Sequence, residues 1–243
     1  MGFNSWFLGK PKNDQELYQK GSILSKINKH EDALRCYEEA ISLDPNLHKE
    51  LWNNYGFTLT DLKRYREALT AFERAIAMDS KYGNSWLGKG RALIFLENYK
   101  EAFFALDEGL NADRLDNDTT MKLWGVKGCA YRTCREYDSS SFCLRKALES
   151  GNDPDLWYEL GQVQIKLKKY EDAIISFDNA IHLAPKIPDY WVYKGCAYYY
   201  MQNYEEAIRC FDRCINMNAS IANSYYYKGV CLFRASRFGP LKK

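Results

Sequence analysis

Residues 154–185 read PDLWYELGQVQIKLKKYEDAIISFDNAIHLAP, and this stretch decides the fold of the chain. Apolar residues recur at spacings of three and four on both sides of a short polar turn at Lys168 and Lys169. This spacing predicts two amphipathic helices of about three turns each. Helices this short cannot bury their apolar faces alone, so neighbouring segments must supply the rest of the core.

Further copies of this stretch recur in one register along the chain. Its glycine recurs every 33 to 38 residues, at Gly21, Gly56, Gly90, Gly128, Gly161, Gly195 and Gly229. The position four residues earlier holds Leu17, Trp52, Trp86, Trp124, Trp157, Trp191 and Tyr225. Positions 12 and 19 after the glycine are mostly small, and position 16 is large and apolar. Small side chains let two helices approach closely, and a large one from each neighbour fills the space beside them.

This pattern resembles the tetratricopeptide repeat (TPR), a unit of two helices with the signature W-x2-L-G-x2-Y, then A-x3-F, then P. One copy carries the signature almost completely, with Trp157, Leu160, Gly161, Ala173, Phe177 and Pro185. The resemblance covers about residues 14–238 and implies an all-α fold, a right-handed α-solenoid of six repeats plus a terminal half repeat. The third and fourth repeats depart from the signature at Leu106, Gly109, Ser140 and Leu144, so we expect looser stacking there.

The two ends of the chain lie outside the repeats. We expect residues 1–13 to form an N-terminal segment in which Phe3, Trp6 and Phe7 cover the first repeat, and residues 239–243 to form a tail. The last predicted helix, about residues 222–235, is apolar on most of its circumference and has no second helix after it. Another surface, a second copy of the chain or a longer array is therefore expected to cover this helix.

Composition excludes several classes of protein. The net charge of +2 gives no strong attraction to nucleic acid or to a membrane surface, and no apolar run approaches the length of a membrane span. The first residues lack a secretory leader. Three of the eight cysteines, Cys36, Cys143 and Cys210, share a slot that takes small residues, which indicates core packing and not disulfides. We therefore expect a cytoplasmic protein that binds neither nucleic acid nor membrane.

No catalytic or cofactor-binding motif is present in the sequence. His30, His48 and His182 fall in or near turns of separate repeats, and no phosphate-binding loop or nucleophile elbow occurs. Cys210 and Cys214 lie one helical turn apart, but no histidine stands near them, so we expect packing and not a metal site. The chain is therefore expected to be no enzyme and to need no cofactor.

The resemblance also implies a binding site, because the first helix of each repeat lines a concave groove in this family. The groove positions of this sequence give thirteen candidate contact residues: Asn53, Asn54, Phe57, Asn84, Arg91, Arg132, Tyr158, Gln162, Lys166, Tyr193, Tyr199, Tyr226 and Tyr227. Asn54, Arg91, Arg132 and Lys166 make the middle polar and suited to an acidic peptide. The tyrosines that follow suit an apolar or extended segment.

Chaperone-binding members of the family use a carboxylate clamp of five residues, and this sequence departs from it. Asn54 matches the asparagine of the second repeat, but Tyr18, Ser22, Asn84 and Gly88 replace the other four residues. We therefore expect no such clamp. The sequence predicts a scaffold that binds an extended peptide or a partner helix. An assembly module acting through the apolar last helix and an RNA-binding helical repeat are the alternatives, and the low net charge disfavours the second.

Overall fold

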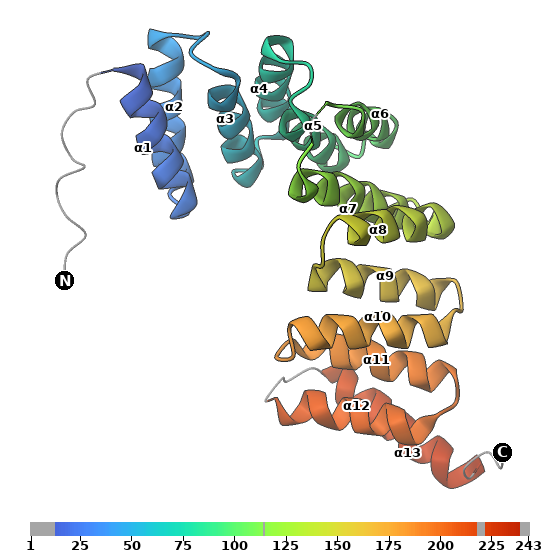
Figure 1. Ribbon diagram of the computed structural model, residues 1–243. Helices are drawn as coiled ribbons and strands as arrows, with labels where there is room; N and C mark the ends of the chain where they lie inside the picture. Colours follow the sequence, from blue (N-terminus) through green and yellow to red (C-terminus); the bar gives the residue numbers. More distant parts are fainter. Residues whose placement is uncertain (1–12, 114, 218–221, 239–243) are drawn as a thin grey trace, which may run out of the picture. The chain divides into compact units, whose positions relative to one another are not determined.

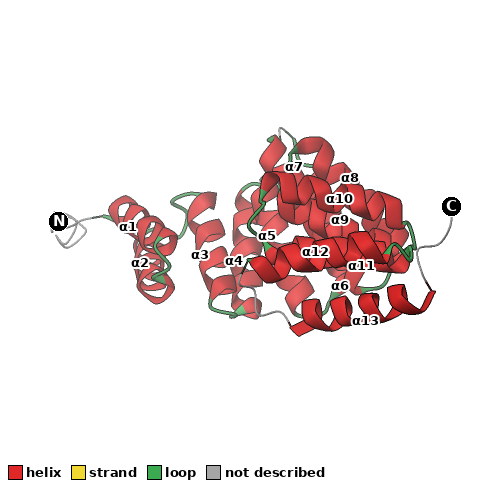
Figure 2. Ribbon diagram, turned by 90° about the horizontal axis from the view of Figure 1, so that it is seen from below, coloured by secondary structure: helices red, strands yellow, loops and turns green. Residues whose placement is uncertain are grey.

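The computed structural model describes residues 13–113, 115–217 and 222–238, and these residues form thirteen α-helices with no strand (Figures 1 and 2). The helices are α1 (Asp14–Lys26), α2 (His30–Leu43), α3 (Lys49–Asp61), α4 (Tyr65–Met78), α5 (Gly83–Phe95), α6 (Tyr99–Leu110), α7 (Asn117–Thr133), α8 (Tyr137–Ser150), α9 (Pro154–Lys166), α10 (Tyr170–Leu183), α11 (Pro188–Tyr200), α12 (Tyr204–Asn216) and α13 (Ala222–Phe238). The odd-numbered helices are the first helices of the repeats and the even-numbered ones the second. The fold is an all-α solenoid of helical repeats, as the sequence predicts.

Contacts divide the chain into two compact units, residues 1–119 and residues 120–243, which we call the N-terminal and C-terminal units. Within the C-terminal unit, helices α9 to α12 lie side by side in chain order (Figure 1). The proposed segments at residues 1–13 and 239–243 fall almost entirely outside the described residues, and Phe3, Trp6 and Phe7 with them. The division into one continuous array with two flanking segments stays a prediction.

In six repeats, the repeated glycine is a point of close approach between the two helices of the repeat. A Cβ atom added to Gly161 would lie 2.6 Å from the ring of Phe177, which is fully buried in α10. The same approach, at 2.7–2.8 Å, pairs Gly21 with Tyr37, Gly56 with Phe72, Gly90 with Leu106, Gly128 with Leu144 and Gly195 with Phe211. A residue with a side chain does not fit there, which confirms the packing that the sequence predicts.

The third and fourth repeats are packed as closely as the others at their unusual positions. Leu106, Ser140 and Leu144 are all fully buried. The hydroxyl of Ser140 donates a hydrogen bond of 2.8 Å to the carbonyl oxygen of Gly128, which satisfies a polar group in the core. The core within each of these two repeats is therefore filled, and looser stacking between the repeats stays a prediction.

Six turns between paired helices share a left-handed backbone conformation that the sequence does not predict. Each places a residue other than glycine in the left-handed region, with φ between 59° and 64°: Asn28, Lys63, Glu97, Arg135, Lys168 and Gln202. In the fifth repeat, the amides of Lys168 and Lys169 donate to the carbonyls of Ile165 and Gln164 at 3.0 and 2.8 Å. This is the Schellman arrangement, and it satisfies carbonyls at the end of the first helix.

Helix α7 carries the extra residues that separate the glycines of the third and fourth repeats. It starts at Asn117 and is 17 residues long, whereas α5 and α9 each have 13. The side chain of Asp116 accepts a hydrogen bond of 2.6 Å from the amide of Thr119, which satisfies a free donor of the first turn. The extra residues of this repeat therefore lengthen its first helix.

Candidate functional site

Aromatic rings connect the first helices of the C-terminal unit. Tyr158 of α9 lies edge-on to Tyr193 of α11, with 5.3 Å between ring centroids. Tyr199 of α11 lies 6.0 Å from Tyr227 of α13, and Tyr226 lies 5.3 Å from Tyr227. All five are tyrosines that the sequence predicts as contact residues, and their ring contacts form two groups on three successive first helices, Tyr158 with Tyr193 and Tyr199 with Tyr226 and Tyr227. We call Tyr158, Tyr193, Tyr199, Tyr226 and Tyr227 the tyrosine face.

The tyrosine face is anchored in the core. The ring of Phe177 lies 6.2 Å from that of Tyr158 and 6.1 Å from that of Tyr193. Tyr227 stacks on the buried ring of Phe211 at 5.9 Å. Tyr226 is 66% exposed, and the other members of the face are half-buried. Each ring therefore has part of its surface fixed by packing and part open, which lowers the entropy lost when a ligand binds.

The hydroxyl groups of Tyr158 and Tyr227 remain neutral at physiological pH. Burial raises the pKa of Tyr158, with the neighbouring Tyr193 acting in the same direction. Burial also raises the pKa of Tyr227. A neutral phenol both donates and accepts a hydrogen bond, so these side chains can serve the backbone of an extended peptide as well as its apolar side chains.

Two further residues extend the tyrosine face, and the sequence does not single them out. Tyr190 is buried, lies 5.1 Å from Tyr158 and donates a hydrogen bond of 2.7 Å to a carboxylate oxygen of Asp155. The guanidinium of Arg234 lies over the ring of Tyr199 at 6.0 Å. Tyr190 stands five positions before its glycine, outside the groove positions of the family, so its contact with Tyr158 is visible only in three dimensions.

The predicted cations of the C-terminal unit differ in their surroundings. Arg132 of α7 is already paired, because its Nε atom lies 2.6 Å from Oε2 of Glu159 on α9. Burial raises the pKa of Glu159, and Arg132 opposes that rise. Lys166 is exposed at the end of α9 and forms no ion pair with the residues described, and Gln162 is half-buried on the same helix. A role for Arg132 toward a partner's carboxylate stays a prediction, and it would require displacement of Glu159.

Asparagine side chains link the first helices of the N-terminal unit. Asn54 donates to the hydroxyl of Tyr18 on α1 at 3.2 Å. Asn53 is only 4% exposed and accepts a hydrogen bond of 3.1 Å from Ser85 on α5. Asn84 accepts one of 3.4 Å from Thr119 on α7. These three predicted contact residues therefore join successive helices, and the buried Asn53 has little surface left for a ligand.

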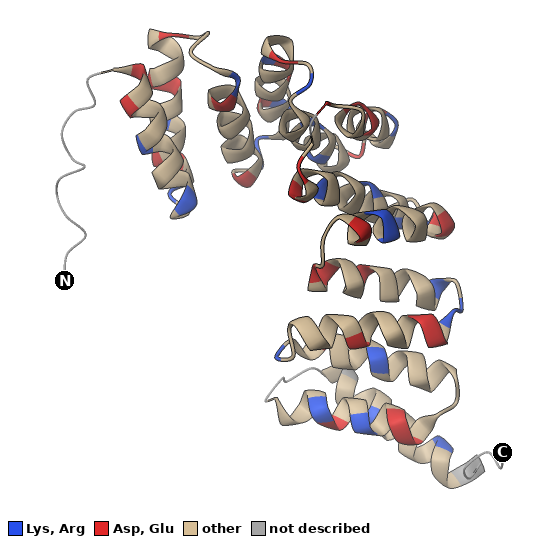
Figure 3. Cartoon of the chain, in the orientation of Figure 1, with Lys and Arg blue, Asp and Glu red and all other residues tan. Residues whose placement is uncertain are grey.

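The other two candidates of the N-terminal unit are Phe57 and Arg91. Phe57 is half-buried and packs edge-on against Phe72 at 5.1 Å. Arg91 is exposed and forms no ion pair with any residue in the described part of the chain. Acidic and basic residues are interspersed along the described helices of each unit (Figure 3).

No cluster of metal-ligating side chains is found among the described residues. They hold no group of three or more His, Cys, Asp and Glu side chains placed to bind a metal ion. His30 lies 3.5 Å from Asp61, and His48 lies against the ring of Tyr18, in separate places. No described helix is long and apolar enough to cross a lipid bilayer.

Comparison with known protein families identifies the family of the chain. Tetratricopeptide repeat models match residues 15–47, 59–118, 122–150, 154–187 and 188–220. The chain belongs to the tetratricopeptide repeat family. TPR units typically form non-catalytic surfaces for binding other proteins, so the chain is a protein-interaction scaffold.

Solved TPR structures share the fold at low sequence identity. YrrB, described as a TPR protein with an unusual peptide-binding site, is 21% identical over 79% of this chain and 97% of its own, with a TM-score of 0.64. PilF of Pseudomonas aeruginosa is 15% identical over 89% and 97%, with a TM-score of 0.76. A chain of the Cut9–Hcn1 hetero-tetramer of the APC/C is 16% identical, with a TM-score of 0.74 over 92% of this chain but 43% of its own. These likenesses show the helical repeat fold alone.

Proposed function

We propose that this TPR protein holds an extended segment of a partner protein against the tyrosine face. The observation that carries the proposal is two sets of ring contacts, from Tyr158 to Tyr193 and from Tyr199 through Tyr227 to Tyr226, which helix α11 links because it holds both Tyr193 and Tyr199. Tyrosine supplies a large contact area and loses little conformational entropy on binding, because it has few rotatable bonds.

The chemistry of the face favours a segment with apolar side chains at intervals. Ring edges and faces offer apolar contact, and the neutral hydroxyls offer hydrogen bonds to the backbone of the bound segment. Because the rings already pack on Phe177 and Phe211, the face needs little rearrangement to receive a ligand. YrrB is described as having a peptide-binding site, which shows that a TPR protein of this fold binds peptides.

Two neighbouring tyrosines of α13 allow a matched test. Peptides are selected from a displayed random library on the immobilised full chain, and their affinities are measured by fluorescence anisotropy. Tyr226→Glu should weaken binding at least about tenfold, because Tyr226 belongs to the face and is 66% exposed, so the substitution leaves the core intact. Tyr225→Glu, at a residue 58% exposed outside the face, should bind as the unmodified chain does.

Equal affinity of the Tyr226→Glu and Tyr225→Glu proteins for every selected peptide would refute this role of the tyrosine face. A further substitution, Tyr199→Ser, probes the middle of the face. It should weaken the same peptides, since Tyr199 joins the α11 part of the face to α13.

A second candidate function, self-association through α13, is favoured by one observation. The six other repeat glycines each face a covering side chain, but no atom of the described residues lies within 4 Å of a Cβ added to Gly229. Tyr225 and Leu232 lie on the same side at spacings of four and three residues and are 58% and 51% exposed. We propose that a second copy of the chain covers this side. Sedimentation velocity should then show association that rises with concentration and is lost in Tyr225→Glu; a monomer at all concentrations would refute it.

A further inference from the structure

Neighbouring repeats are joined by one recurrent ion pair. An acidic residue 17 positions after a repeat glycine meets a lysine just before the glycine of the next repeat. The pairs are Glu73 with Lys89 at 2.9 Å, Asp178 with Lys194 at 2.5 Å and Asp212 with Lys228 at 2.5 Å. At the first junction the hydroxyl of Tyr55 donates to Glu38 in the same two slots, at 3.4 Å.

The lysine of this pair also covers the tryptophan of its repeat. The Nζ atom of Lys89 lies 5.7 Å from the ring centroid of Trp86, and that of Lys194 lies 5.7 Å from that of Trp191. Half or more of each lysine side chain is shielded from solvent, with exposed fractions of 24% and 15%. The pair therefore closes the space between the second helix of one repeat and the first helix of the next, above the tryptophan.

The junction between the fourth and fifth repeats breaks this rule at both positions together. The acidic slot holds Glu38, Glu73, Asp107, Asp178 and Asp212 elsewhere, but Arg145 here. The lysine slot holds Leu160, directly before Gly161. No ion pair can form between an arginine and a leucine, and Trp157 has a leucine in place of the covering lysine.

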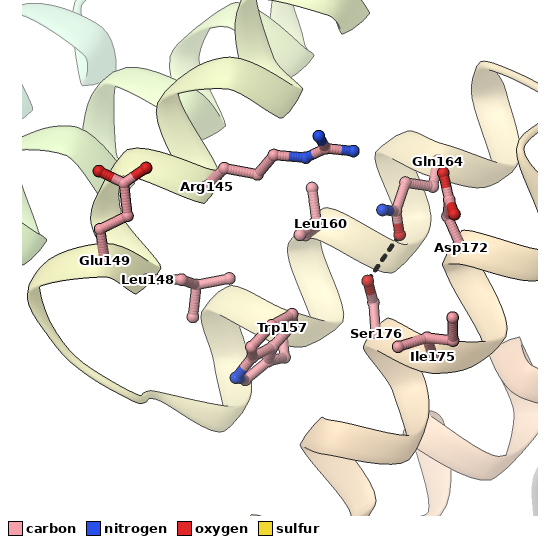
Figure 4. A pocket seen from close by; sticks show the side chains of 9 residues that line it. All are labelled: Arg145, Leu148, Glu149, Trp157, Leu160, Gln164, Asp172, Ile175 and Ser176. Atoms are coloured by element: carbon pink, nitrogen blue, oxygen red, sulfur yellow. Dashed lines mark hydrogen bonds between the residues drawn. The ribbon is translucent and has the colours of Figure 1, made fainter.

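A pocket of about 400 Å³ opens at this junction, between α8, α9 and α10 (Figure 4). Its apolar lining comes from Leu148 of α8, Trp157 and Leu160 of α9, and Ile175 of α10. Ile175 is 60% exposed although it is a large aliphatic residue. Trp157 uses its indole N–H in a hydrogen bond of 2.6 Å to Asn152, so it offers the pocket an apolar ring.

Charged side chains stand at the rim of the pocket. Arg145 is exposed, forms no ion pair with any residue that the structure describes, and extends over Leu160 (Figure 4). Glu149 is paired with Lys146 at 2.8 Å. Asp172 is exposed at the α10 side of the rim, more than an ion-pair distance from Arg145. At the pocket floor, Ser176 donates to Gln164 at 2.6 Å, which satisfies both of these buried groups.

We propose that this pocket docks an acidic–apolar motif of a partner protein, distinct from the segment on the tyrosine face. A large aliphatic or aromatic side chain of the motif enters between Leu148, Trp157 and Ile175. A carboxylate beside it in the partner sequence pairs with Arg145 and takes the place of the acidic group that every other junction supplies from within the chain. Trp157 and Tyr158 are consecutive on α9 and point about 100° apart, so the two sites address different sides of the helix.

The ion pairs of the other junctions indicate which substitutions would close the pocket. Arg145→Asp combined with Leu160→Lys rebuilds the ion pair seen at three other junctions, so the substituted repeat is expected to fold. Peptides are selected from a displayed random library on the full chain, and synthetic copies are measured by fluorescence anisotropy. Peptides with Asp or Glu within two residues of Leu, Ile, Phe or Trp should be enriched, and the closed double variant should bind them at least about tenfold more weakly. Arg145→Glu, at an exposed residue, should have the same effect and requires no repacking.

Tyr226→Glu separates this site from the tyrosine face. Peptides of the acidic–apolar class should bind the Tyr226→Glu protein with unchanged affinity, whereas peptides of the tyrosine face should lose affinity there and keep it in the closed double variant. Unchanged binding of the acidic–apolar class by both the closed variant and Arg145→Glu overturns the proposal. Absence of this class from the selected peptides also overturns it, whatever happens to the tyrosine face.

Discussion

The packing of Gly161 against Phe177 leads to a prediction with a matched internal control. A Cβ atom at residue 161 would lie 2.6, 2.7 and 2.9 Å from three atoms of the Phe177 ring. Carbon atoms in contact prefer about 3.5–4 Å, so the ring must move by about 1 Å. Phe177 is fully buried, and its movement disturbs every neighbour in the α9–α10 core. Overpacking of this kind costs about 1–3 kcal/mol.

Helix propensity acts in the opposite direction and is measured at a second glycine. Alanine favours a helix over glycine by about 1 kcal/mol, so Gly161→Ala should destabilise the chain by about 1 kcal/mol net. Gly229→Ala should stabilise α13 by up to about 1 kcal/mol, because none of the atoms that the structure describes lies within 4 Å of the added methyl group. The difference between the two variants, about 2 kcal/mol, then reports the overpacking alone.

Native-state hydrogen exchange is the suitable assay, because the opening free energies of α9, α10 and α13 are measured separately in a repeat protein. In the Phe177→Ala background, Gly161→Ala should no longer destabilise, since the ring that it meets is gone. Equal or slower exchange in α9 and α10 of Gly161→Ala, compared with the unmodified chain, would show that the glycine slot is not sterically required.

Three further predictions follow from single residues. Lys168→Gly should raise the free energy of unfolding by about 1 kcal/mol in urea denaturation, because Lys168 has φ 60° and glycine adopts that conformation without strain. Iodoacetamide at pH 8 should alkylate the exposed Cys134 at least about tenfold faster than Cys129, whose pKa burial raises to about 12, as mass spectrometry of the native protein would show. Burial raises the pKa of Glu159 in the folded chain above its value in the unfolded chain. The contribution of Glu159 to the free energy of unfolding is therefore fully present below the unfolded pKa and is lost as the pH rises through the folded pKa. Arg132→Met should raise the pKa of Glu159 further, measured by carbon-detected NMR titration; an unchanged or lower pKa would contradict the pairing.

The repeat framework could be predicted from the sequence because one residue type recurs in each slot. The glycine, the residue four before it and the large residue sixteen after it define two helices and their contact, and the approach of Gly161 to Phe177 confirms it. The tyrosines of α9, α11 and α13 were found in the same way, from their distance to the glycine. Whether they bind a partner is a matter for experiment.

The turn conformation, the Arg132–Glu159 ion pair and the pocket beside Arg145 could not be predicted, because they depend on which residues lie close together in the folded chain. Lysine, glutamate, arginine and glutamine are not typical left-handed residues, so only Asn28 hinted at the turn conformation. Arg132 and Glu159 lie 27 residues apart, and nothing in the sequence indicates that their side chains pair. The sequence shows that Arg145 replaces the acidic residue and Leu160 replaces the lysine of the other junctions. It does not show that these two positions face each other in the fold.

Photo-crosslinking from a bound peptide tests most directly whether the tyrosine face binds an extended segment of a partner protein. A peptide selected on the full chain, with a photoreactive group at its centre and affinity that Tyr226→Glu weakens, is irradiated in the complex, and the linked residues are identified by mass spectrometry. We expect crosslinks to α9, α11 and α13 at or beside Tyr193, Tyr199 and Tyr226. Crosslinks confined to the second helices α8, α10 and α12 would contradict it.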